Sequence, residues 1–86
     1  MGSAKRWKPR NLHKKLKQIR MNLGLSQGEM VRALGLTSRL VQKNISTYEQ
    51  GEREPPLPVL LRYARLAGVS VETLIDDKLD LSMPRK

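Results

Sequence analysis

The chain has 86 residues and a mass of 9.8 kDa, which suits one small domain and leaves no room for a catalytic domain with a separate substrate-binding domain. Its 17 Lys and Arg residues against 8 Asp and Glu residues give a formal net charge of +9, which points to a polyanionic partner. Cysteine is absent and His13 is the lone histidine, so we expect no disulfide, metal or other cofactor. No apolar run approaches the roughly 20 residues of a transmembrane helix, so we expect a cytoplasmic protein without a membrane anchor.

The positive charge is concentrated at the amino-terminal end of the chain. Residues 1–20 hold eight basic side chains and no acidic one, whereas the rest holds nine basic and eight acidic side chains. Trp7, Tyr48 and Tyr63 are too few aromatic residues for the base-stacking platforms of many single-strand and RNA binders, so duplex DNA is the better polyanion. Residues 1–10 are predicted to form a basic arm, either along a DNA groove or free in solution as a solubilising segment.

Two helices are predicted in the first half of the chain. Four apolar residues fall at i, i+4, i+7 and i+11: Leu12, Leu16, Ile19 and Leu23. This spacing forms one stripe of a helix that Asn11 can cap and Gly24 can end. Ser26 and Glu29 have the spacing of a capping box, which predicts a second helix over about 27–34.

Three further helices are predicted after Gly35. Val41, Ile45 and Tyr48 have helical spacing, so a third helix ends near Gln50, with its start left open. A fourth helix is expected over about 57–67, and a short fifth one after Ser70. Residues 77–86 are assigned to a tail, and no sustained strand pattern is found.

An ordered set of short motifs spans residues 20–74. It reads Arg20-(x3)-Gly24-Leu25-Ser26-Gln27-(x2)-Met30, Leu34-Gly35-Leu36, Ile45-Ser46-(x)-Tyr48-Glu49-(x)-Gly51-(x3)-Pro55, Leu60-(x3)-Ala64 and Gly68-Val69-Ser70-Val71-(x2)-Leu74. The set resembles the Cro/repressor-type helix-turn-helix family, also called the XRE family. The resemblance implies an all-α fold: a compact, five-helix, lambda-repressor-like DNA-binding domain over 11–76, between the basic arm of 1–10 and the tail of 77–86.

The resemblance also implies roles for individual residues. Residues expected to contact bases carry amide, ammonium or hydroxyl groups that suit base edges: Gln27, Gln42, Lys43, Asn44 and Thr47. Residues expected to contact phosphates lie around them or near the amino-terminal end: Ser26, Arg39, Gln50, Arg53, Lys14, Lys15 and Arg10. Arg20 and Glu49 are expected to form a structural ion pair between the first and third helices.

The chain departs from the family pattern between Leu36 and Ile45. Eight residues lie between them, where a turn of about four is usual. The third helix could begin one turn earlier, capped by Thr37 or Ser38, which the spacing of Val41 favours. Alternatively, the turn is longer and Asn44 caps a short helix.

The expected function is that of a transcriptional regulator that binds double-stranded DNA sequence-specifically. It is expected to act as a homodimeric repressor on a short operator. The alternative is a protein-interaction module, such as an antitoxin, whose tail binds a partner protein through residues 79–83. Non-specific DNA packaging would use the same charge without reading bases. An enzyme is not expected, because no nucleophile–base pair, phosphate-cradling loop or catalytic carboxylate pair is found.

Overall fold

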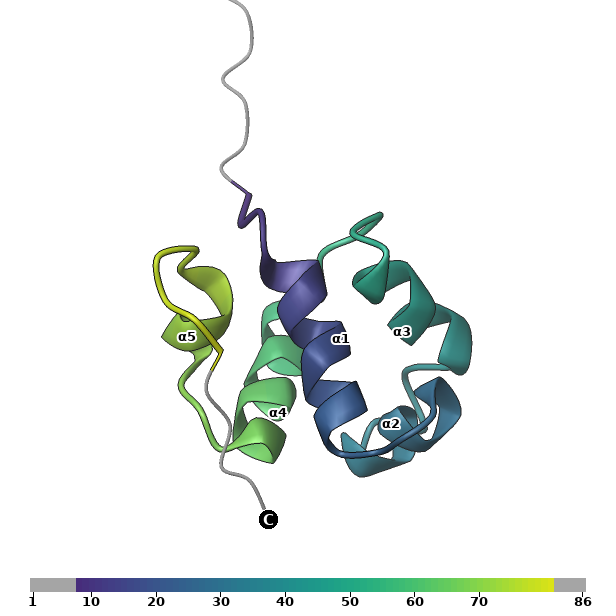
Figure 1. Cartoon of the computed structure of the whole chain (residues 1–86). Coiled ribbons are helices and arrows are strands. Elements are labelled where there is room, and N and C mark those ends of the chain that lie inside the picture. Colours follow the sequence, from purple (N-terminus) through teal and green to yellow (C-terminus); the bar gives the residue numbers. More distant parts are fainter. Residues whose placement is uncertain (1–7, 82–86) are drawn as a thin grey trace, which may run out of the picture.

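The computed structural model describes residues 8–81, in which the chain forms five helices and no strand (Figure 1). The helices are α1 (Leu12–Asn22), α2 (Gln27–Ala33), α3 (Gln42–Glu49), α4 (Leu57–Ala67) and α5 (Val71–Ile75). The predicted all-α, five-helix fold is therefore confirmed. Residues 1–7 of the predicted arm and 82–86 of the predicted tail lie outside the described residues. None of the five helices is long and apolar enough to cross a bilayer.

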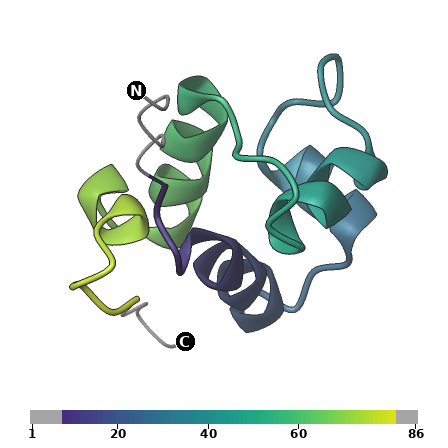
Figure 2. The same cartoon turned by 90° about the horizontal axis from the view of Figure 1, so that it is seen from above.

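Helix α1 lies in the middle of the domain, with α2 and α3 on one side of it and α4 and α5 on the other (Figures 1 and 2). Every helix contributes at least one fully buried side chain to a single core: Leu16, Ile19, Met30, Ile45, Tyr63 and Leu74. The stripe predicted on α1 is buried at Leu12, Leu16 and Ile19. The core thus holds the α2–α3 pair at a fixed place against α1.

Side-chain caps define where the short helices begin. Ser26 Oγ accepts a hydrogen bond from Glu29 N, and Ser26 N donates to Glu29 Oε1, so the predicted capping box is confirmed. Ser70 Oγ accepts from Thr73 N at the start of α5, as its predicted capping role requires. These bonds satisfy backbone groups that have no partner within the helix.

The start of the first helix differs from the one predicted. Asn11 occupies the position before α1, but its side chain makes no capping hydrogen bond. The carboxylate of Asp77 instead accepts from Arg10 N at 2.9 and 3.0 Å and from Asn11 N at 3.0 Å. The prediction for the Asn11 side chain is therefore wrong, and a carboxylate distant in the sequence binds the backbone N–H groups of Asn11 and of the residue before it.

The extra residues before Ile45 lengthen the turn and not the helix. Residues 37–39 form a turn, and α3 begins only at Gln42. Val41 precedes the helix and is 64% exposed, so the earlier helix start that its spacing favoured is wrong. Asn44 does not precede the helix either. It is the third helical residue, and its Oδ1 accepts from Val41 N at 2.8 Å.

Candidate nucleic-acid interface

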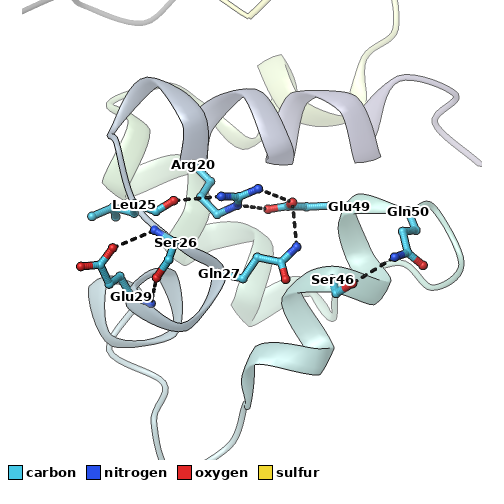
Figure 3. A network of polar contacts seen from close by, with 8 residues as sticks. All are labelled: Arg20, Leu25, Ser26, Gln27, Glu29, Ser46, Glu49 and Gln50. Carbon is cyan, nitrogen blue, oxygen red and sulfur yellow. Dashed lines mark hydrogen bonds and ion pairs between the residues drawn. The ribbon is translucent and has the colours of Figure 1, made fainter.

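The expected ion pair between Arg20 and Glu49 is present and joins α1 to α3 (Figure 3). Arg20 Nε lies 2.7 Å from Glu49 Oε2, and Arg20 Nη2 lies 3.0 Å from Glu49 Oε1. The third guanidinium nitrogen, Nη1, donates to Leu25 O at 2.9 Å in the loop before α2. The two side chains are 12% and 4% exposed, and the hydrogen bond to Glu49 raises the pKa of Arg20. The pair therefore fixes α3 relative to α1 and the start of α2.

Gln27, the first residue of α2, joins the same network. Its Nε2 donates to Glu49 Oε1 at 3.3 Å, and the side chain is half-buried (Figure 3). Gln27 was predicted to contact a base, and one of its amide hydrogens is directed here at a neighbouring carboxylate. Glu49 thus connects α1, α2 and α3 at one point.

The exposed side of α3 presents the other residues that were predicted to contact bases. Gln42 and Lys43 are exposed, and Asn44 and Thr47 are half-buried, whereas Ile45, Tyr48 and Glu49 on the opposite side are buried. Thr47 Oγ1 donates to Lys43 O at 2.9 Å, and the Lys43 ammonium group has no partner within residues 8–81. Gln42 Oε1 would lie 3.8 Å from a Cβ atom added at Gly28, so the side chain of Gln42 approaches the first turn of α2.

Two short helices, joined by a turn, thus present a polar edge from a fixed scaffold. A sequence model of the helix-turn-helix domain matches residues 13–79, which is most of the chain. The chain belongs to the Cro/repressor-type helix-turn-helix family. This is a DNA-binding family without enzymatic activity, so the expectation that the protein is not an enzyme is confirmed.

The helix-turn-helix fold also has a close match among solved structures. The c2 repressor protein of P22, in complex with a synthetic operator, matches with a TM-score of 0.66 and 21% sequence identity. The match covers 77% of this chain and 94% of that repressor chain. No curated protein sequence matches this chain. The likeness to the repressor confirms the predicted lambda-repressor-like fold.

Most residues of this helix-turn-helix protein that were predicted to contact phosphates are accessible. Five of them are exposed within a single protomer: Arg10, Lys14, Ser26, Arg39 and Arg53. Gln50 is also exposed, and its Nε2 donates to Ser46 Oγ at 3.0 Å (Figure 3). These side chains come from the segment before α1, α1 itself, the start of α2, the turn before α3 and the region just after α3.

Lys15 is the exception, and its predicted phosphate contact is wrong. The residue is 5% exposed, and its Nζ donates to Thr73 O at 2.8 Å, Asp76 O at 3.0 Å and Leu79 O at 2.8 Å. All three ammonium hydrogens are thereby used inside the protein. A signal was present in the sequence, because Lys15 lies between Leu12, Leu16 and Ile19 on the buried stripe of α1.

The described residues contain no group of three or more His, Cys, Asp or Glu side chains that could hold a metal ion. The chemistry that this surface offers consists of amide, hydroxyl, ammonium and guanidinium groups. Such groups form hydrogen bonds to base edges and phosphates.

Proposed function

We propose that the protein is a sequence-specific, double-stranded-DNA-binding transcriptional regulator that represses by occupying a short operator. The observation that carries this proposal is the exposed start of α3, where Gln42 and Lys43 project from a helix whose other side is buried. The recognition helix of a helix-turn-helix protein reads base edges with residues near its amino-terminal end. The Arg20–Glu49 pair would hold this edge in one orientation while DNA binds.

The side chains at this edge suit different bases. The amide group of Gln42 suits the N6 and N7 atoms of adenine, and Lys43 suits the O6 and N7 atoms of guanine. Asn44 Oδ1 already accepts from Val41 N, so Asn44 would reach a base through its Nδ2. Thr47 donates its hydroxyl hydrogen to Lys43 O, which leaves its methyl group for a thymine and its oxygen lone pairs for a donor. Gln27 would reach a base or a phosphate through its amide oxygen, since Nε2 already donates to Glu49.

Phosphate contacts would position this edge without reading sequence. We assign them to the exposed residues near the starts of α1 and α2 and on both sides of α3: Arg10, Lys14, Ser26, Arg39, Gln50 and Arg53. The basic residues of the arm would add contacts along the backbone or in a minor groove. Each neutralised phosphate should lower log K by about 0.9 for every unit of log salt concentration.

We further propose that the protein binds DNA as a homodimer. One recognition helix reads only a few base pairs, so two half-sites about 10 base pairs apart would supply the remaining specificity. Leu57, Leu61 and Ile75 are exposed apolar side chains on α4 and α5, and Leu57 and Ile75 line one groove. These helices lie on the other side of α1 from α3 (Figure 1). Contact between two copies through this surface would leave both α3 edges free for DNA.

The protein-interaction alternative is less well supported. It requires residues 79–83 of the tail to be available to another protein. Leu79 O accepts a hydrogen bond from Lys15, and Leu81 packs against the core of its own domain. Residues 82–83 lie outside the described part of the chain.

Selection from a random pool of DNA duplexes tests the proposed function directly. We expect the protein to enrich a short palindromic sequence, and we expect gel-shift titrations on that sequence to show a steep loss of affinity with salt. The matched control is a scrambled duplex of the same composition and length. Binding with equal affinity to both duplexes, and no enriched sequence, would contradict a sequence-specific regulator.

A further inference from the structure

A wide groove opens between the start of α1, the start of α4 and the end of α5, three helices that pack against one another. It has a volume of about 980 Å³. The buried residues Leu12 and Leu60 line it together with Leu57 and Ile75, which are 76% and 43% exposed. Exposed apolar residues that gather around one hollow mark a binding surface. Since α4 and α5 lie on the other side of α1 from α3 (Figure 1), this groove is separate from the edge that is proposed to read bases.

The groove is acidic, although the chain as a whole has a formal net charge of +9. Four of the chain's 8 acidic residues line it: Glu54, Glu72, Asp76 and Asp77. Among residues 8–81, only Lys78 adds a positive charge to this lining. Carboxylates repel DNA phosphates and attract cations. The groove therefore suits an occupant that carries both an apolar side chain and positive charge.

The chain supplies such a segment directly beside the groove. Pro9 lines the groove, and Lys5, Arg6 and Trp7 precede it closely in the sequence. Since one residue spans at most about 3.6 Å, the two positions between Pro9 and Trp7 correspond to a reach of about 7 Å. A second hollow lined by Pro9 has a volume of only about 60 Å³, the space of a few water molecules, so it is too small for an indole ring. The large groove is thus the hollow beside Pro9 that can hold the ring of Trp7.

We propose that this groove binds the chain's own segment 5–7 in the protein free of DNA. The indole ring of Trp7 covers Leu57 and Ile75, and the cationic groups of Lys5 and Arg6 pair with the carboxylates of the lining. While they are paired there, Lys5 and Arg6 are not available to DNA phosphates, so the arm reaches DNA only after it leaves the groove. Leu57 and Ile75 also belong to the surface proposed for the homodimer, so a bound arm and a second copy exclude each other. Formation of the dimer would thereby release the arm to DNA.

Tryptophan fluorescence of the whole chain without DNA tests this proposal, because Trp7 is its only tryptophan. The reference is a synthetic peptide of residues 1–9. For the protein at a dilution where light scattering shows a monomer, we expect an emission maximum at a shorter wavelength than that of the peptide, and weaker quenching by acrylamide. Leu57→Lys and Glu72→Lys each place a positive charge in the groove, so each should shift the emission toward that of the peptide.

Leu61→Lys is the matched control. Leu61 lies one turn after Leu57 on α4, is 39% exposed and does not line the groove. The same charge at this position should leave the emission of Trp7 unchanged, and circular dichroism should show that all three variants are folded. Emission like that of the peptide, or emission that either groove variant leaves unchanged, would overturn the proposal. A shift to shorter wavelength that is confined to dimeric samples would also overturn it, because the ring would then contact a second copy. None of these outcomes involves DNA, so the proposed function is tested separately by the selection experiment.

Discussion

Arg20 and Glu49 form a nearly buried, two-point ion pair between the first helix and the end of the third, with a shortest contact of 2.7 Å. Arg20 also binds Leu25 O, and Glu49 also accepts from Gln27. The pair therefore links both helices of the helix-turn-helix to α1 through charged hydrogen bonds, which are stronger than neutral ones. The orientation of α3 on DNA should depend on it, although neither residue belongs to the exposed edge of α3.

Glu49→Gln should destabilise the domain strongly. It leaves the Arg20 guanidinium almost buried without its counter-charge, which we expect to cost about 3–5 kcal/mol in the free energy of unfolding. Urea denaturation followed by circular dichroism measures this loss. The control is the double variant Arg20→Met with Glu49→Leu, which removes both charges and should be less destabilised than Glu49→Gln alone. If the loss in the double variant equals the sum of the losses in Arg20→Met and Glu49→Leu, the two residues do not act as a pair.

Lys15→Met should destabilise the protein but should change its affinity for DNA very little. The substitution keeps an apolar stem but withdraws the donor that Thr73 O, Asp76 O and Leu79 O share. We expect a loss of about 1–3 kcal/mol, because three partly buried acceptors lose their donor. The matched control is Lys14→Met on the exposed side of α1, which should leave stability within about 0.5 kcal/mol. Equal stability of the two variants would contradict a structural role for Lys15.

Local patterns predicted much of this fold, and contacts between distant residues account for what they missed. Ser26 and Glu29 lie three positions apart, so their reciprocal cap can be recognised in the sequence. The partners of Lys15 are backbone carbonyls 58 to 64 positions away. Because every residue has such a carbonyl, the sequence does not indicate which of them Lys15 will bind. The start of α3 was ambiguous because four extra residues are close to one helical turn, so an earlier start would also have placed Val41 in phase with Ile45.

The hydrogen bonds that Asp77 accepts just before α1 should make stability depend on acid pH. The hydrogen bonds from Arg10 N, and then from Asn11 N, hold the pKa of Asp77 below its usual value. Since the pKa is lowered on folding, this contribution is complete above the unfolded pKa of about 4 and is lost as the pH falls through the folded value. Urea denaturation from pH 6 down to pH 2 should show a shallower acid loss for Asp77→Asn than for the natural protein. Asp80→Asn, on an exposed residue nearby, serves as the control. Identical pH profiles for Asp77→Asn and the natural protein would contradict a stabilising role for these hydrogen bonds.

Tyr63→Phe should not destabilise the protein, although Tyr63 is fully buried. Its hydroxyl group has no hydrogen-bond partner among residues 8–81, and burial raises its pKa well above the ordinary tyrosine value. Removing an unsatisfied hydroxyl while keeping the ring should leave the free energy of unfolding unchanged or raise it by about 1 kcal/mol. Thermal and urea unfolding measure the difference. A loss of more than about 1 kcal/mol would mean that the hydroxyl group has a partner in solution.

Lys43→Ala and Lys14→Ala should separate base reading from phosphate binding. Both lysines are exposed and both substitutions remove one positive charge, but Lys43 lies on the edge of α3 and Lys14 on α1. Lys43→Ala should relax the preference for one base pair of the selected operator, at a cost of about 1–3 kcal/mol for that duplex. Lys14→Ala should weaken all duplexes by a similar factor and lower the salt slope by about 1. Parallel selections and salt titrations measure both effects. Equal, sequence-independent losses from both variants would favour non-specific packaging of DNA, because a protein that reads bases cannot lose a reading residue and a backbone contact with the same result.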